Sequence, residues 1–322
     1  MGRPARCIIL AVLALSGARW GAAQEPGARA PDEPAANAPS AGPPSSPRRE
    51  PRSFHDWLLG PLSGKEDPDG PINTDRPSFT PANTVVPKGR LQIESGFSFT
   101  HDRTSTSSTG AYVYPELAVR VGIARRVEFR TYWLGETDMF SRPNRPGAPT
   151  QITRGASDME VGFKTQLLFG DDEKRWRPTT ALITSVIAPT GGNSPFGSQS
   201  VSPFVALLYG WSLTKHLTLA GGTGEVSSRR RILGGPNPHS DNFEQFFQSA
   251  LLFYSPNERL TLYHEWYALM YTNADDDRPL HNMDSGVLYR PTPNTQLDLR
   301  AGFGVGDRPG DFITGAGFSV RF

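Results

Sequence analysis

Ionisable side chains of both signs recur at alternate positions along several stretches of this chain. Glu116 and Arg120 share one parity of such a stretch, and Glu128 and Arg130 share one parity of the next. Alternate residues of a β-strand point to the same face of its sheet, so each stretch would carry its charges on one face. Acids and bases gathered on one face can line a polar path through a protein, or they can pair with one another and fill that path.

A serine and a histidine suggest a second kind of chemistry. Counting outward from a short turn at 255–258 places Ser249 opposite His264 on adjacent strands, both on the apolar face. A histidine beside a serine can act as its general base in ester hydrolysis, as in phospholipases of the outer membrane. The nearest groups that could orient the ring, Glu265 and Asp284, have the opposite parity. A lipid hydrolase is therefore the lesser alternative, and no catalytic residue is assigned.

Cofactor and metal chemistry find little support in the sequence. Cys7 is the only cysteine and lies near the start of the chain, so no disulfide, thiolate metal centre or cysteine nucleophile is expected beyond it. The acids at 275–277 could ligate calcium, but three adjacent acids are more typical of a solvated loop. With 33 Lys and Arg against 32 Asp and Glu and no basic patch, the chain is not expected to bind nucleic acid.

The elements that carry these side chains are predicted to be strands. About twelve stretches between Leu91 and Phe322 alternate apolar residues with polar or small ones. In the last of them Phe312, Phe318 and Phe322 share one side, and an aromatic residue at the end of a strand suits a membrane interface. The pattern predicts an all-β fold, namely a transmembrane antiparallel up-and-down β-barrel of about 12 strands.

The gaps between these strands alternate in length. The longer gaps lie near 101–110, 135–154, 189–199, 224–242 and 272–280, and the shorter ones near 122–126, 170–177, 212–215, 255–258 and 291–294. In bacterial outer-membrane barrels the periplasmic turns are short and the extracellular loops are longer. The rhythm predicts a barrel in the cell outer membrane with both termini in the periplasm.

The charged parity is expected to face the lumen and the apolar parity to contact outer-membrane lipids. An arginine or lysine that faces lipid at the membrane midplane costs about 2–4 kcal/mol. The residues expected to line the lumen are Glu94, Tyr112, Tyr114, Glu116, Arg120, Glu128, Arg130, Asp158, Lys164, Glu265, Asp298 and Arg300. Just before the first strand, Asp75, Arg76 and Pro77 could fold into the lumen as a plug or could simply lead into that strand.

The part of the chain before residue 74 has a different composition. Over residues 1–23, two arginines precede a short apolar run and small residues follow it, which is typical of a secretory signal peptide. Residues 24–73 are rich in Pro, Ala, Ser and Gly and are predicted to form a disordered linker. The barrel, with its lead-in or plug segment, is expected over residues 74–322.

Several motifs resemble one protein family. They are TDRPSFT at 74–80, VPKG at 86–89, SDMEVGFK at 157–164, APTG at 188–191, QLDLR at 296–300 and GAGFSVRF at 315–322. Together they are similar to the Putative MetA-pathway of phenol degradation family, whose members are often described as outer-membrane transporters.

The resemblance implies a barrel that passes aromatic or other small hydrophobic compounds, with no cofactor and no catalytic residues. We therefore predict a passive outer-membrane channel or transporter rather than an enzyme. The alternative is a structural barrel without transport. The identity of the solute and the oligomeric state remain open at this point.

Overall fold

The computed structural model describes residues 70–170, 176–198, 200–232, 239–272, 279–306 and 312–322. The chain divides into two units, Met1–Pro47 and Arg48–Phe322, and all described residues belong to the second. The predicted signal peptide at 1–23, nearly all of the predicted linker at 24–73 and the acids at 275–277 therefore lie outside the described residues.

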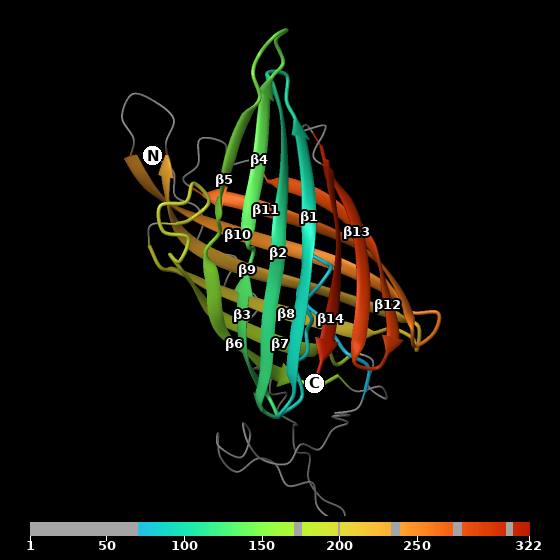
Figure 1. The fold of residues 1–322 in the computed structure, drawn as a ribbon. Helices are drawn as coiled ribbons and strands as arrows, with labels where there is room; N and C mark the ends of the chain where they lie inside the picture. The colour runs from blue at the N-terminus through green and yellow to red at the C-terminus, as the bar shows by residue number, and fades with distance from the viewer. Residues whose placement is uncertain (1–69, 171–175, 199, 233–238, 273–278, 307–311) are drawn as a thin grey trace, which may run out of the picture. The chain divides into compact units, whose positions relative to one another are not determined.

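The described residues form fourteen β-strands in one antiparallel sheet (Figure 1). The strands are β1 (Leu91–Arg103), β2 (Ser107–Ala124), β3 (Val127–Trp133), β4 (Glu136–Pro143), β5 (Gln151–Ala156), β6 (Met159–Leu168), β7 (Thr179–Ala188), β8 (Ser202–Ser212), β9 (Leu217–Ile232), β10 (His239–Tyr254), β11 (Leu260–Thr272), β12 (Leu280–Thr292), β13 (Thr295–Val305) and β14 (Phe312–Arg321). No helix within these ranges is long and apolar enough to cross a membrane.

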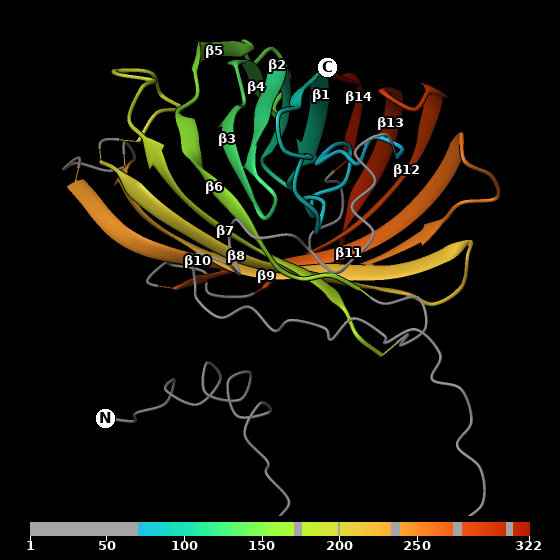
Figure 2. The same cartoon turned by 90° about the horizontal axis from the view of Figure 1, so that it is seen from below.

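The sheet closes on itself, because β1 pairs with β14 on one side and with β2 on the other (Figure 2). β2 pairs with two strands in line, β4 along its first residues and β3 along its last ones. The next position in the wall is shared in the same way by β5, which pairs with β4, and β6, which pairs with β3. Two pairs of strands thus occupy two positions, and the fourteen strands make a closed twelve-stranded barrel. The predicted barrel of about 12 strands is confirmed.

Two gaps that the sequence suggested to be long loops contain strands. β4 and the start of β5 lie within 135–154, and β1 and β2 continue until only residues 104–106 separate them. The apolar alternation fades in this region because the outer face becomes polar, with Glu136 exposed and Asp138 paired to Arg154 at 3.1 Å. Hydrogen bonds between strands join backbone groups, so the strands continue where the side-chain pattern ends.

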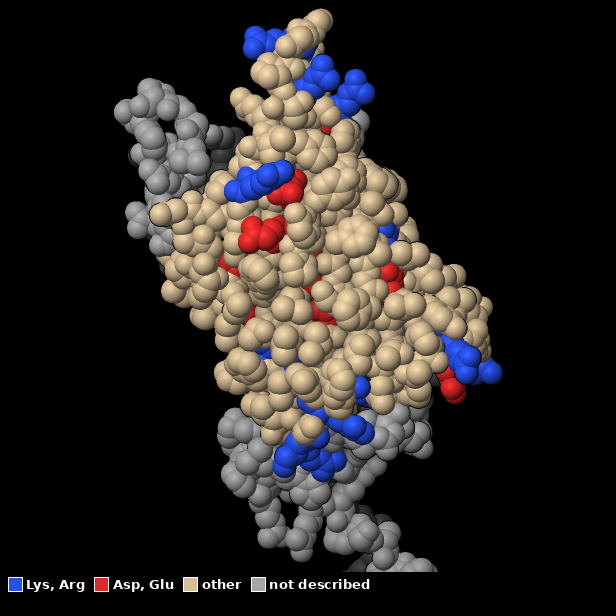
Figure 3. Space-filling model, viewed as in Figure 1, with Lys and Arg blue, Asp and Glu red and all other residues tan. Residues whose placement is uncertain are grey.

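The outer and inner surfaces of the barrel differ in chemistry. On β13 the outward residues Leu297, Leu299 and Phe303 are 52%, 61% and 58% exposed, whereas the inward Gln296 and Asp298 are buried. Figure 3 shows an outer face with few charged side chains between its two ends, apart from a small group over β4 and β5. A closed barrel satisfies its backbone hydrogen bonds internally, so one with an apolar exterior can span a bilayer.

The interior has two unlike walls. Most buried charged residues lie on β1, β2, β3, β6, β13 and β14. Strands β7 to β12 carry two apolar clusters, together with the buried acids Glu265 and Asp284. The first cluster comprises Ile183, Ala206, Leu208 and Phe247, and the second comprises Ala220, Leu251, Tyr263 and Leu288. We call the two sides the ionic wall and the apolar wall.

Candidate functional site inside the barrel

Residues 70–89, here called the inner segment, run inside the barrel before the chain joins β1 (Figure 2). Both ends of the segment are tied to one end of the barrel, since Ile72 N donates to Pro293 O at 2.7 Å and Gly89 N donates to Gly122 O at 2.7 Å. Its middle crosses the interior to Glu265 on β11. The segment therefore enters and leaves at the same end and reaches both walls.

The inner segment has no strand partner over most of its length, so side chains of the ionic wall satisfy its backbone. Prolines at 71, 77, 81 and 87 lack the N–H group that a strand or helix interior requires, which keeps the segment irregular. Asp75 N and Arg76 N donate to the Glu94 carboxylate at 3.1 and 3.0 Å, and Val86 N donates to Glu128 at 2.7 Å. Buried N–H groups must find such partners, and here the wall supplies them.

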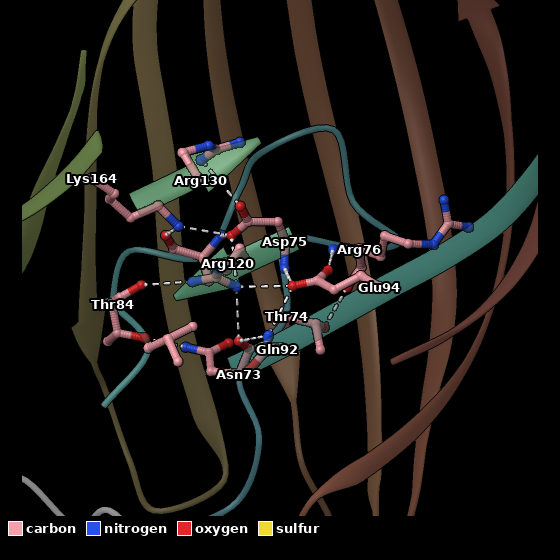
Figure 4. Close-up of polar contacts among 12 residues, drawn as sticks. Asn73, Thr74, Asp75, Arg76, Thr84, Gln92, Glu94, Arg120, Arg130 and Lys164 are labelled. Carbon is pink, nitrogen blue, oxygen red and sulfur yellow. Dashed lines mark hydrogen bonds and ion pairs between the residues drawn. The ribbon is translucent and has the colours of Figure 1, made fainter. Parts of the chain in front are cut away.

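Asp75 lies among three cations of the ionic wall (Figure 4). Its carboxylate is 2.8 Å from Lys164 Nζ, 3.1 Å from Arg130 Nη1 and 3.2 Å from Arg120 Nη1. Burial by itself would raise the pKa of Asp75, but these three cations outweigh it and hold that pKa well below its ordinary value. Asp75 is therefore an anion inside the barrel.

Arg76 points to the acids on the other side of the segment. Its guanidinium pairs with Glu116 and lies 3.4 Å from Asp298. Burial would lower the pKa of Arg76, whereas Glu116 and Asp298 raise it above its ordinary value. The guanidinium fits against the wall only because two neighbours are glycines, since a Cβ on Gly96 or on Gly317 would lie 2.4 Å from its atoms.

The charges of the ionic wall also pair with one another. Arg120 contacts Glu94 and Glu128 at 2.9 Å each, and Lys164 lies 3.5 Å from Glu128. All four side chains are buried, and the loss of one partner from a buried pair costs about 3–5 kcal/mol. The inner segment is thus held by a connected set of buried ion pairs rather than by strand pairing.

The tip of the inner segment contacts the apolar wall. Glu265 accepts hydrogen bonds from Phe79 N at 2.8 Å, from Thr80 N at 2.9 Å and from the Thr80 hydroxyl. The Thr80 hydroxyl also contacts the Ser249 hydroxyl on β10. The Phe79 ring packs against the first apolar cluster. The segment therefore spans the lumen from the ionic wall to the apolar wall.

Comparison with known proteins identifies the family. The model of the family described as Putative MetA-pathway of phenol degradation matches residues 74–322. The chain belongs to that family. The match covers the inner segment from Thr74 and every strand of the barrel. No curated protein sequence matches the chain.

Solved structures similar to this member of the family include a porin and an autotransporter domain. KdgM porin in complex with disordered oligogalacturonate is 11% identical, covers 72% of this chain and 99% of its own, and has a TM-score of 0.44. The transport unit of the autotransporter AIDA-I from Escherichia coli is 10% identical, covers 72% and 90% of the two chains, and has a TM-score of 0.48. The assignment of the fold rests on the strand pairing of the chain itself.

The structure of this family member brings most of the predicted lumen residues together. It places on the inner face Glu94, Glu116, Arg120, Glu128, Arg130, Lys164, Glu265, Asp298 and Arg300. Asp75, Arg76 and Pro77 are buried among them. Asp158 has another position, just before β6, where its carboxylate accepts hydrogen bonds from Gly191 N at 2.8 Å and from Ser198 N. It thereby anchors the connection between β7 and β8.

The prediction that Tyr112 and Tyr114 face the lumen was wrong. The register between β1 and β2 shifts between two pairs, Gly96 with Glu116 and Ser98 with Val113. Two residues advance on β1 while three advance on β2, so the faces of β2 exchange at this bulge. Tyr112 and Tyr114 consequently lie on the outer face, 47% and 43% exposed.

The predicted pairing of Ser249 with His264 was also wrong. The predicted turn would pair Tyr254 with Arg259, whereas the observed pairs join Tyr254 to Leu262 and Ser249 to Tyr267. A shift by an odd number of residues exchanges the faces of one strand relative to the other. Ser249 is therefore buried inside, while His264 is exposed and lies 2.7 Å from the Ser285 hydroxyl. The two side chains cannot form a catalytic pair.

The sequence analysis missed the uncharged polar residues that bind the inner segment. Gln92 Nε2 donates to Asn73 O at 2.9 Å, and Gln166 Nε2 donates to Asn83 O at 3.1 Å. Both glutamines share the parity of the charged residues on their strands, so the same count over all polar side chains would have found them. Thr80 had no such signal, because it lies outside the strands.

Proposed function

We propose that this protein is a passive outer-membrane channel or transporter for small apolar or aromatic solutes, which the inner segment closes at rest. The observation that carries the proposal is the division of the interior into an ionic wall, which binds the inner segment through several ion pairs, and a mostly apolar wall, which carries two hydrophobic clusters and binds the tip through Glu265. Membership of a family described by phenol degradation agrees with an aromatic solute.

The apolar wall supplies the surface that such a solute needs. Phe204 and Leu269 are half-buried and pack on the first apolar cluster, so part of each side chain is available from the lumen. Pockets for small organic molecules are mostly apolar, with a few polar groups that fix orientation. Glu265 and Ser249 lie at the edge of this surface and would serve as those polar groups.

The outer surface supports placement in a membrane, and the ends of the chain support a topology. The apolar exterior fits contact with outer-membrane lipids. Arg321 Nη2 donates to Gly70 O at 2.5 Å, so the start of the described chain and its last strand share one end of the barrel. That end carries the short turns at 125–126 and 293–294, and short turns face the periplasm in bacterial barrels. We therefore place both termini in the periplasm.

Closure by the inner segment is argued from the size of the barrel and from its contacts. Eight-stranded barrels fill with side chains and sixteen-stranded ones leave an aqueous channel, so twelve strands leave room that an additional segment can occupy. The inner segment crosses this space and contacts both walls. Its removal would leave an open lumen with one ionic and one apolar side.

The test is conductance and solute flux in lipid bilayers. We compare the full chain with two N-terminal deletions. The first lacks the residues before 70 and keeps the inner segment. The second lacks the residues before 78 and so removes Asp75 to Pro77. We expect low conductance from the first two proteins and higher conductance, with faster flux of phenol into liposomes, from the third. Absence of conductance and flux in all three would contradict the proposal and leave a structural barrel.

A further inference from the structure

We propose that the apolar wall contains a binding site for a planar aromatic ring, which Phe79 of the inner segment now occupies. We call this site the aromatic slot; Phe247 and Tyr267 contact the Phe79 ring, and Phe204 and Leu269 pack on the same apolar cluster as Phe79. An aromatic solute in the lumen competes with Phe79 for the slot and so favours release of the segment tip. The inference deepens the proposed function by naming the site of the solute and linking its binding to opening.

The packing of Phe79 has the geometry of a bound aromatic ligand. Its ring is stacked on Tyr267, with centroids 4.2 Å apart and planes 6° apart. Its edge meets Phe247 at 5.3 Å and 83°. Aromatic pairs prefer offset-stacked or edge-to-face arrangements, and Phe79 makes one of each. The slot therefore recognises a flat ring by two different contacts.

The slot belongs to the barrel and does not depend on the inner segment for its shape. Phe247 packs against Phe204 at 6.3 Å and 21° between the planes, and both rings rest on the buried cluster of β7, β8 and β10. Gly224 on β9 makes room for this arrangement, because a Cβ there would lie 2.4 Å from the Phe247 ring. The wall would keep these rings in place after Phe79 leaves.

A solute can reach the slot from the lumen. Phe79, Phe204 and Tyr267 are each half-buried, so their rings are not sealed inside the wall. Phe247 is 6% exposed and forms the base of the slot. A ring that arrives from the lumen therefore meets the same edges and faces that Phe79 now covers.

Displacement of Phe79 would weaken the hold on the tip of the inner segment. Phe79 N and both polar groups of Thr80 donate to Glu265, and Pro77 O accepts from Arg300 Nη1 at 3.1 Å. Phe79 N is itself one of these donors and Thr80 is the next residue, so displacement of Phe79 strains the bonds to Glu265 and lets water compete for them. Binding of a solute ring is thus coupled to opening through one side chain.

The first test measures binding of phenol to the purified full-length protein, with cyclohexanol as the non-planar probe of matched size. Removal of the competing ring in Phe79→Ala should raise phenol affinity by about 2- to 10-fold, the factor that corresponds to one aromatic pair. Tyr267→Leu should lose the preference for phenol over cyclohexanol. Phe303→Ala, which removes an outward ring on β13, should leave phenol binding unchanged.

A second set of variants distinguishes the effect of removing the Phe79 ring from the slot from the effect of weakening the hydrogen bonds that hold the segment tip. Thr80→Val removes the hydroxyl contacts to Glu265 and Ser249 but leaves the Phe79 ring in place. It should raise conductance but raise phenol affinity by less than Phe79→Ala does, because the Phe79 ring is still present to compete. Phe79→Leu keeps the apolar volume at the tip and should give an affinity between those of the wild type and Phe79→Ala.

The proposal is overturned if phenol affinity is the same in the wild type and in Phe79→Ala, if Thr80→Val gains as much affinity as Phe79→Ala, or if cyclohexanol binds as well as phenol. These outcomes concern binding and are independent of transport. Competition between phenol and Phe79 without flux in any variant would support the slot and contradict the channel. Flux without competition would support the channel and contradict the slot.

Discussion

At the scale of single residues, Asp75 and Arg76 form the most connected point of the interior. They are adjacent in the chain and of opposite charge, yet each points away from the other toward partners of the opposite sign, Asp75 toward Lys164 and Arg76 toward Glu116. Buried charges are tolerated only where such partners are in place. This pair therefore ties the inner segment to two parts of the ionic wall at once.

Replacement of Asp75 by asparagine should destabilise the closed barrel. Asn has nearly the same shape but no charge, so Arg120, Arg130 and Lys164 would lose the anion they share. A buried pair that loses one partner costs about 3–5 kcal/mol, and part of that cost would appear as release of the segment. We expect a lower urea midpoint for the refolded protein and a higher conductance.

The matched control is Asp138→Asn on the outer face. It breaks a pair with Arg154, which is 71% exposed, and exposed pairs contribute about 0–1 kcal/mol. If Asp75→Asn and Asp138→Asn lower the urea midpoint equally, the buried ion pairs of Asp75 contribute no more to stability than an exposed pair, and the prediction is contradicted.

The pKa of Asp75 predicts how closure depends on pH. Because its folded-state pKa lies below its unfolded value of about 3.9, the contribution of Asp75 is fully present above that pH and is lost as pH falls toward the folded-state pKa. The part of closure that depends on Asp75 should therefore persist from neutral pH to about 4 and be lost only below it, which would appear as a rise in conductance. Titration of bilayer conductance checks this, with Asp75→Asn as the control that should lack this component.

At the scale of elements, β2 determines the geometry of the wall around the site. It is the longest strand described, and its bulge between two pairing registers lets it hold β3 on one half and β4 on the other. On the half of β2 that pairs with β3, the even-numbered residues, such as Arg120, face the lumen. On the half that pairs with β4, the odd-numbered residues face the lumen. Both charged residues of β2, Glu116 and Arg120, lie on the same side of the bulge as β3 and face the lumen.

Spin labels on β2 test this change of phase. We expect a label at Tyr112→Cys to collide with reagents outside the barrel, as a label at Val119→Cys does, because both positions face outward. A label at Ala118→Cys, which is buried inside, should not. Without the bulge, positions 112 and 118 would share a face, so matching accessibilities at those two positions would contradict the observed register.

At the scale of the barrel, the connections at its two ends predict its orientation in the membrane. The loop at 144–150, which contains the exposed Arg145, lies at the end opposite the turn at 213–216, which contains the exposed Lys215. The inner segment and β14 share the end of the barrel that carries Lys215. With both termini in the periplasm, Arg145 would lie outside the cell.

Limited trypsin treatment of intact cells tests the orientation. The bond between Arg145 and Pro146 resists trypsin, so the site to follow at that end is the exposed Arg103, beside the connection between β1 and β2. We expect cleavage after Arg103 and protection of Lys215, because the membrane shields the periplasmic end. Treatment of lysed cells should expose both sites and serves as the control for accessibility. Cleavage at Lys215 in intact cells, with Arg103 spared, would reverse the topology.

The sequence by itself determined the strands of the barrel and the inward parity of most of its charges. Both follow from a local rule, because alternate residues of any strand share a face. Glu94 and Lys164 could therefore be placed inside before any pairing was known. The same rule found twelve strand positions, since the apolar alternation runs through all of them except the polar extension formed by β4 and β5.

Only the tertiary structure decided the positions that depend on register. Tyr112 and Ser249 changed face because hydrogen-bonded partners, not the residues themselves, determine where a bulge lies and where a turn closes. The path of the inner segment was likewise undetermined, since irregular backbone has no period and follows whatever partners surround it. Asp75 meets Lys164 across 89 positions of sequence, and that contact exists only once the barrel has closed and brought the cations of several strands around one point.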